Sequence, residues 1–117
     1  MADFIDENRI VYPVDTSKKK LTIGRSEECD ITVPPTNSEM KRQIECPTTF
    51  LQIAHRATYY SVSRHHAVLH PEEGLIIDNN SSYGTRINDT KLEPKYAAKL
   101  ESGDSVVFGT LCLYYIE

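Results

Sequence analysis

The chain has 117 residues, 39% hydrophobic and 26% charged, which suits one domain with a single core and excludes a disordered composition. Its formal net charge of -4 argues against nonspecific binding of nucleic acid, which normally needs a basic excess. No apolar run is long enough to span a membrane, and the first residues are acidic where a secretory leader would be basic and then apolar. We therefore expect an intracellular protein, nuclear or cytoplasmic, with no membrane partner.

The N-terminal third of the chain predicts short strands. Residues 1–8 are polar and predict an N-terminal tail, so that a single domain covers residues 9–117. Residues 9–14 carry β-branched and aromatic side chains with one proline, a pattern typical of an edge strand. Alternating patterns over residues 21–25 and 29–33 predict two more strands, the first stopped by a glycine and the second by two prolines.

The segment from Pro34 to Tyr60 lacks this alternation. Ser38 is a candidate cap for one short helix, and Thr48 or Thr49 for a second helix. The alternative is an irregular loop with one small strand, since helices this short depend on tertiary packing.

Short strands separated by turn residues resume after this segment. Ala67 and Leu69 alternate with Val68 and His70, as in a strand with one buried face. The expected strands are residues 67–70, 75–78, 85–88, 91–92, 105–108 and 111–116. The last two form a closing hairpin, and the whole pattern predicts an all-β domain.

Three polar loops follow or precede these strands: Gly24-Arg25-Ser26, Ser63-Arg64-His65-His66 and Asn80-Ser81-Ser82-Tyr83-Gly84. If the strands stack as a sandwich, such loops can gather at one end. Together they offer guanidiniums, hydroxyls and backbone N–H groups. This inventory suits a tetrahedral dianion, because arginine supplies a bidentate fork and glycine lets the backbone come close.

The sequence resembles the forkhead-associated (FHA) domain family in four ordered motifs. They are Leu21-Thr22-Ile23-Gly24-Arg25, Ser63-x-x-His66, Asp78-x-x-Ser81-x-x-Gly84-Thr85-x-x-Asn88 and Leu100-x-x-Gly103-Asp104-x-Val106-x-Phe108-Gly109. Each motif alone is a weak signal, whereas the ordered set over residues 21 to 109 is a strong one. The resemblance implies a β-sandwich of two twisted, mainly antiparallel sheets, with an irregular or partly helical insertion at about residues 34–60.

The same resemblance implies a module that binds phosphothreonine peptides and mediates phosphorylation-dependent protein–protein interactions in signalling. Arg25 would contact the phosphate, and Ser63 would hydrogen-bond it through its hydroxyl. Arg64 would add backbone or guanidinium contacts, and Ser82 occupies the place of a threonine that commonly touches the phosphate.

Three further positions would be architectural: Gly24, His66 and Gly84. The chain departs from the family at Tyr83, where asparagine is usual before the glycine. A phenol cannot reproduce the hydrogen-bond pair of an amide, so we expect the affinity or register of the peptide to differ. The insertion at residues 34–60 is also longer than usual in the family.

Other readings of these residues are weaker. His65, His66 and His70 could suggest a metal site with Cys29 or Asp78, but no second clustered pair accompanies them and no Cys-x-x-Cys spacing occurs. We expect reduced cysteines, and no metal or cofactor. A hydrolase hypothesis would combine Ser63, His66 and Asp78 as catalytic residues, but nothing around Ser63 resembles a nucleophile elbow. We therefore expect that the protein is not an enzyme.

An alternative function keeps the same fold. The domain would then bind a partner independently of phosphate, through the 34–60 insertion or an exposed sheet face. Under this hypothesis Phe50 and Leu51, rather than Arg25, would carry partner binding. The sequence names no partner beyond a phosphothreonine-containing protein or peptide, and it leaves the oligomeric state undetermined.

Overall fold

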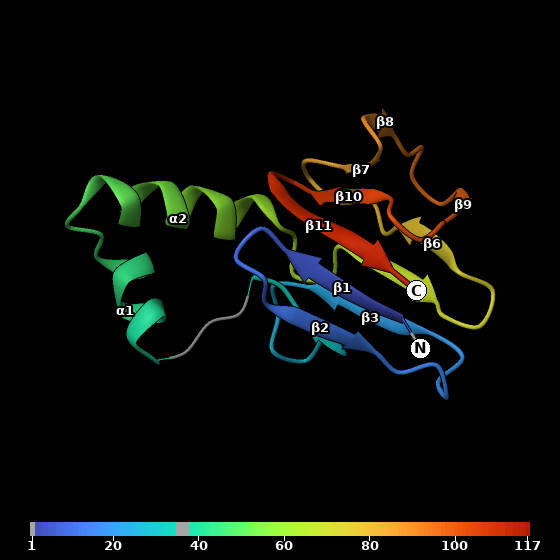
Figure 1. Cartoon of the computed structure of the whole chain (residues 1–117). Coiled ribbons are helices and arrows are strands. Elements are labelled where there is room, and N and C mark those ends of the chain that lie inside the picture. Colours follow the sequence, from blue (N-terminus) through green and yellow to red (C-terminus); the bar gives the residue numbers. More distant parts are fainter. Residues whose placement is uncertain (1, 35–37) are drawn as a thin grey trace.

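A computed structural model describes residues 2–34 and 38–117 and shows two β-sheets with two helices projecting from one end (Figure 1). The strands are β1 (Ala2–Asp6), β2 (Val11–Val14), β3 (Leu21–Gly24), β4 (Ile31–Thr32), β5 (Ala67–His70), β6 (Leu75–Asp78), β7 (Thr85–Ile87), β8 (Thr90–Lys91), β9 (Ala97–Lys99), β10 (Ser105–Phe108) and β11 (Leu111–Ile116). One sheet has the order β2-β1-β11-β10-β7-β8 and the other β4-β3-β5-β6-β9. Over the described residues the pairs are antiparallel except for β3 with β4. The expected all-β sandwich with a helical insertion is thus confirmed.

The N-terminal segment is a strand, so the prediction of a tail over residues 1–8 is wrong. β1 lies between β2 and β11 in the six-stranded sheet, and Phe4 is fully buried. Asp6 is buried as well, but its carboxylate accepts hydrogen bonds from two backbone N–H groups of the next turn and from the Tyr12 hydroxyl. These partners let an acidic side chain occupy a buried position. Burial and the neighbouring Asp6 raise the pKa of Tyr12 above its ordinary value.

One hydrophobic core lies between the sheets. In β5, Ala67 and Leu69 are buried while their neighbours are partly exposed, as the alternation predicts. The rings of Phe4, Phe108 and Tyr115 are fully buried at the centre of this core. Phe4 lies edge-on to Phe108 with ring centroids 6.3 Å apart and is tilted against Tyr115 at 5.4 Å. Such contacts add to the free energy of burying aromatic surface.

Two helices occupy most of the insertion, which confirms the helical interpretation over the irregular loop. They are α1 (Ser38–Glu45) and α2 (Phe50–Ser61), and residues 35–37 of the insertion lie outside the described residues. Thr49 caps α2 through a capping box, in which its hydroxyl accepts from the Gln52 backbone N–H and the Gln52 side chain accepts from the Thr49 backbone N–H. These reciprocal bonds satisfy N–H groups that the first turn leaves unpaired.

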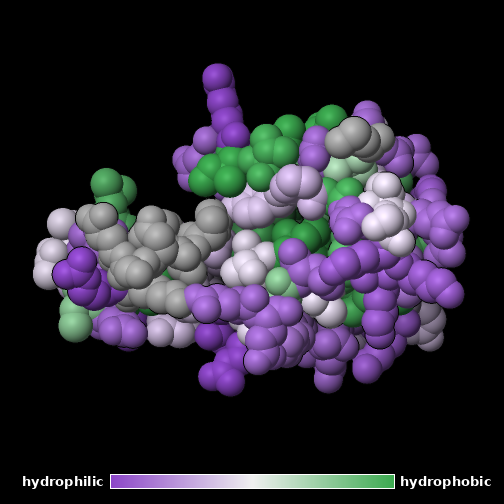
Figure 2. Space-filling model, turned by 90° about the horizontal axis from the view of Figure 1, so that it is seen from below, coloured by the Kyte–Doolittle hydropathy of each residue, from purple (hydrophilic) through white to green (hydrophobic). Residues whose placement is uncertain are grey.

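Helix α2 projects away from the sandwich, and only its C-terminal end is fixed to it (Figure 1). Phe50 and Leu51, at the far end, are 84% and 80% exposed, and Figure 2 shows the helical part protruding with hydrophobic side chains on its surface. At the near end, the Ser61 hydroxyl lies 2.9 Å from the Thr110 hydroxyl and accepts from the Thr110 backbone N–H at 3.0 Å. The next residue, Val62, is fully buried in the core.

Neither helix in the described part of the chain is long and apolar enough to cross a membrane.

Cys29, Cys46 and Cys112 are free thiols, as the scattered spacing predicts.

Candidate functional site

The register of the five-stranded sheet brings three loops together. Ile23 in β3 pairs with Ala67 in β5, and Ala67 pairs with Asp78 in β6. Because both pairs are antiparallel, the end of β3, the start of β5 and the end of β6 share one edge of the sheet. The three polar loops identified in the sequence therefore adjoin one another at this edge.

The first two loops are joined through their backbones. The N–H of Arg25 donates to the Ser63 carbonyl at 3.1 Å, and the N–H of Ser26 donates to the Arg64 carbonyl at 3.2 Å. A Cβ atom on Gly24 would lie 2.1 Å from the Arg64 carbonyl oxygen, a distance at which backbone atoms must move. Glycine is therefore required for this close approach of the two loops.

The side chain of Arg25 lies along the second loop. Its Nε–H donates to the Val62 carbonyl at 2.9 Å. The guanidinium also lies 5.5 Å from the ring centroid of Tyr59 and 5.3 Å from that of Tyr60, in the last turn of α2. At such distances the rings attract a cation. Among the described residues, no hydrogen bond occupies the Nη groups of this arginine.

Ser63 links the second loop to the third. Its hydroxyl oxygen accepts a hydrogen bond from the backbone N–H of Ser82 at 3.1 Å. A serine hydroxyl carries one proton and two acceptor sites, so this bond leaves the proton of Ser63 available to another acceptor. The hydroxyl is thereby held at a fixed place between the loops.

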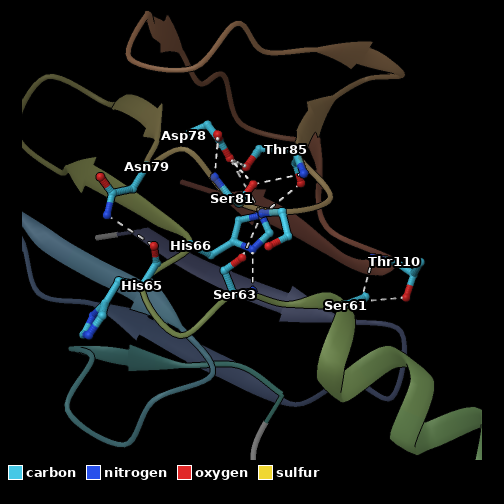
Figure 3. Close-up of polar contacts among 11 residues, drawn as sticks. Ser61, Ser63, His65, His66, Asp78, Asn79, Ser81, Thr85 and Thr110 are labelled. Carbon is cyan, nitrogen blue, oxygen red and sulfur yellow. Dashed lines mark hydrogen bonds and ion pairs between the residues drawn. The ribbon is translucent and has the colours of Figure 1, made fainter.

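His66 is fully buried, and its imidazole links the second and third loops by hydrogen bonds (Figure 3). Its Nδ1 accepts from the Ser63 backbone N–H at 3.0 Å, and its Nε2 lies 2.9 Å from the Gly84 carbonyl oxygen. Both bonds form when the neutral imidazole carries its proton on Nε2. Burial lowers the pKa of His66 below its ordinary value, although the Gly84 carbonyl and the carboxylate of Asp78, 3.9 Å from Nε2, act in the opposite direction.

Asp78 fixes the third loop (Figure 3). Its buried carboxylate accepts from the hydroxyls of Ser81 and Thr85 at 2.6 and 2.7 Å, and from the Ser81 backbone N–H. The Ser81 hydroxyl in turn accepts from the N–H of Gly84, which has a φ of 85°. Asp78 is therefore a structural acceptor. The hydrolase arrangement is absent here, because both ring nitrogens of His66 bind backbone groups rather than the Ser63 hydroxyl.

The family model described as FHA domain matches residues 21–109, which is most of the chain and includes all three loops. The chain belongs to the FHA-domain family. No curated protein matches its sequence.

Solved FHA domains share this fold at low sequence identity. An FHA domain analysed for phosphothreonine-dependent interactions superimposes with a TM-score of 0.69 at 17% identity, covering 99% of this chain and 95% of the other. The FhaA FHA domain, complexed with the intracellular domain of Rv3910, gives 0.68 at 17% identity over 98% and 99% of the two chains. The N-terminal FHA domain of S. cerevisiae Rad53p, in complex with a phosphothreonine peptide, gives 0.64 at 19% identity over 98% and 91%.

A hollow in this FHA domain contains some of the residues expected at the site. Arg25 and Arg64 both line it, beside Tyr59. Ser26, Glu27, Glu28 and His65 complete the lining. The hollow therefore combines two guanidiniums with two carboxylates.

The remaining expected residues lie around this hollow rather than in its lining. Ser63 adjoins Arg64 in the chain and is bonded to the loop of Ser82. Ser82 and Tyr83 are exposed, with 67% of Tyr83 accessible. The asparagine that the FHA family usually has before the glycine is thus replaced by an outward tyrosine.

Sequence reasoning missed the contacts of Tyr59 and Tyr60 with Arg25. Their place three and four residues before Ser63 was the available signal, because a helix that ends at the second loop must bring its last turn close to the first. Among the side chains that the structure describes, no group of three or more His, Cys, Asp or Glu residues is arranged to hold a metal ion.

Proposed function

We propose that this FHA domain binds phosphothreonine-containing peptides at the edge formed by the three loops, with Arg25 as the principal phosphate ligand. The observation that carries the proposal is the hydrogen bonding of the Arg25 guanidinium. Its Nε is bonded to Val62, whereas its Nη groups have no acceptor among the described residues and the side chain lines the hollow. A guanidinium presented in this way suits the bidentate recognition of a phosphate.

The neighbouring groups supply the remaining contacts. The Ser63 hydroxyl retains its proton for a phosphate oxygen, and Arg64 adds a second positive charge. Ser82 contacts the phosphate from the third loop, and Tyr83 contacts the peptide beside the phosphothreonine. Gly24, His66 and Gly84 hold the loops in place. The S. cerevisiae Rad53p domain, which is similar in fold, was solved with a phosphothreonine peptide, and this supports the same ligand class here.

Phosphorylation increases affinity because it adds about 1.5 to 2 negative charges and three strong acceptors. An oriented phosphothreonine peptide library should first select a ligand, whose affinity is then measured by calorimetry with and without the phosphate. Arg25→Ala should weaken binding by more than about tenfold, since a charge-assisted hydrogen bond contributes roughly 1.5 to 3 kcal/mol. Raised salt should also weaken it.

Arg86→Ala is the matched control, because Arg86 is an exposed arginine of β7 in the other sheet, and its loss should leave the affinity unchanged. Equal affinity for the phosphorylated and unphosphorylated peptides would overturn the proposal. Replacing phosphothreonine by phosphoserine should cost on the order of 0.8 kcal/mol, the value of one buried methyl group.

In the cell, we propose that the domain mediates phosphorylation-dependent interactions in intracellular signalling, in the nucleus or cytoplasm. It acts as a binding module without catalysis, metal or cofactor, and it needs neither nucleic acid nor membrane.

A second candidate function is phosphate-independent binding of a protein partner to α2. It is favoured by the exposure of Phe50 and Leu51, because large exposed apolar side chains in a group mark interaction surfaces. A pull-down with Phe50→Ser/Leu51→Ser and Arg25→Ala separates the two functions. Partner loss only with the helix variant supports the second, and loss only with Arg25→Ala supports the first.

A further inference from the structure

The last turn of α2 contributes an aromatic pair to the phosphate site. The Arg25 guanidinium lies 5.5 Å from the Tyr59 ring and 5.3 Å from the Tyr60 ring. The two rings meet nearly edge-on, with centroids 5.0 Å apart and planes at 83°. Arg25 thus borders two aromatic surfaces that belong to the inserted helix rather than to the sheets.

These contacts restrict a side chain that would otherwise be mobile. A free arginine loses up to about 2 kcal/mol of rotamer entropy when it is ordered, and that cost weakens binding if it is paid when the ligand arrives. The Nε bond to Val62 fixes one edge of the guanidinium, and the aromatic pair limits its rotation. The Nη groups are therefore oriented before any phosphate binds.

The tyrosines are themselves held in place. Ser61 is bonded to Thr110 through both its hydroxyl and the Thr110 N–H, and Val62 is buried in the core. The backbone directly after the aromatic pair is thus anchored to the β10–β11 turn. An anchored support is what a positioning contact requires.

We infer that Tyr59 and Tyr60 are positioning residues for Arg25, so that the inserted helix α2 forms part of the phosphate-recognition site. This inference rests on the proposed phosphopeptide function and adds the residues that preorganise its arginine. The Arg56 guanidinium also lies over Tyr60, 5.8 Å from the centroid of the tyrosine ring. Tyr59, which lines the hollow with Arg25, is the more selective position to test.

The test measures two properties of each variant. The first is the affinity for the phosphothreonine peptide selected from the library, relative to its unphosphorylated form. The second is the Arg25 Nε–H signal in a ¹⁵N-resolved NMR spectrum without peptide, because an aromatic ring shifts a nearby proton. Tyr59→Leu keeps apolar bulk without the ring, Tyr59→Phe keeps the ring, and Tyr96→Leu replaces an exposed tyrosine elsewhere.

Tyr59→Leu should weaken phosphopeptide binding about three- to tenfold, which corresponds to the loss of one cation–π contact, and should shift the Arg25 Nε–H signal. Tyr59→Phe and Tyr96→Leu should retain both the affinity and the signal. Tyr60→Leu, at a more exposed position, should also weaken binding. It replaces Tyr59→Leu in the test if circular dichroism shows that Tyr59→Leu does not fold.

The outcomes separate this inference from the proposed phosphopeptide binding on which it rests. Wild-type protein that does not distinguish the phosphorylated peptide overturns both. Phosphate-dependent binding that is lost in Arg25→Ala but unchanged in Tyr59→Leu and Tyr60→Leu overturns the inference alone. So does a Tyr59→Phe variant as weak as Tyr59→Leu, since the ring would then not be the relevant group.

Discussion

At the scale of single residues, His66 connects the second and third loops through one imidazole. The ring serves as acceptor for Ser63 and donor for Gly84, which only its neutral form can do. Protonation of Nδ1 would remove the acceptor for Ser63, the residue whose hydroxyl we assign to the phosphate. The protonation state of one buried side chain therefore affects both stability and the site.

This arrangement predicts a pH dependence of stability. Burial lowers the pKa of His66 in the folded state, while the unfolded chain has the ordinary value of about 6.5. Below that pH the unfolded state binds more protons than the folded state, so the free energy of unfolding falls as the pH drops from about 7 toward the folded pKa.

Urea unfolding at a series of pH values measures this slope. His66→Gln should be less stable near neutral pH but should show a shallower decline on acidification. His70→Gln is the control, since His70 is a partly exposed histidine whose ring lies 3.3 Å from the Lys19 carbonyl oxygen. An unchanged slope in His66→Gln would contradict the prediction.

Gly24 permits a second local test. A methyl group there would meet the backbone of Arg64 and Ser63, and strain of this kind typically costs about 1 to 3 kcal/mol. Gly24→Ala should lower the midpoint of urea unfolding and weaken phosphopeptide binding together, because it separates the two loops. Lys20→Ala, in the exposed turn before β3, should change neither.

At the scale of elements, α2 depends on its cap at the end that protrudes. Thr49→Ala should remove roughly 1 kcal/mol of helix stability, and because this end of α2 is solvated, the effect should be local. Amide hydrogen exchange should accelerate in the first turns of α2 while the global unfolding midpoint changes little. Thr49→Ser keeps the hydroxyl and should preserve the protection. A global loss of stability equal to that of a core substitution would contradict this view.

Local sequence patterns predicted those elements whose signals are contained within them. Thr49 with Gln52 marks the start of α2, and the alternation around Ala67 gives the buried face of β5. β1 was missed because Asp6 reads as a surface residue, and its burial depends on a hydrogen bond from Tyr12, on another strand.

The candidate site also has a part that the sequence predicted and a part that it did not. The loops around Arg25, Ser63 and Ser82 were predicted by motif, and the sheet register brings them together. The contact of Arg25 with Tyr59 could not be predicted, because it depends on the direction in which the inserted helix leaves the sandwich, which no periodicity within the helix specifies.

At the scale of the whole molecule, β1 closes the six-stranded sheet between β2 and β11 and contributes Phe4 to the centre of the core. Phe4→Ala should therefore reduce the free energy of unfolding by about 3 to 5 kcal/mol, as large-to-small changes at buried aromatic positions do. Ile10→Ala, at a position 42% exposed, should cost far less. Urea titration of both variants measures the difference, and equal costs would show that β1 does not support the core.

The projecting helix makes the molecule elongated, 43 Å along its longest axis against 26 and 24 Å. α2 has 12 residues and so extends about 18 Å, with Phe50 at its outer tip and Tyr60 beside the guanidinium. An extended peptide covers that length in about five or six residues. A single ligand that engages both ends would need an apolar side chain about this far from its phosphate. Two weak attachments at that spacing would reinforce each other through effective concentration. The length of α2 would then set the spacing between the apolar residue and the phosphate in such a ligand.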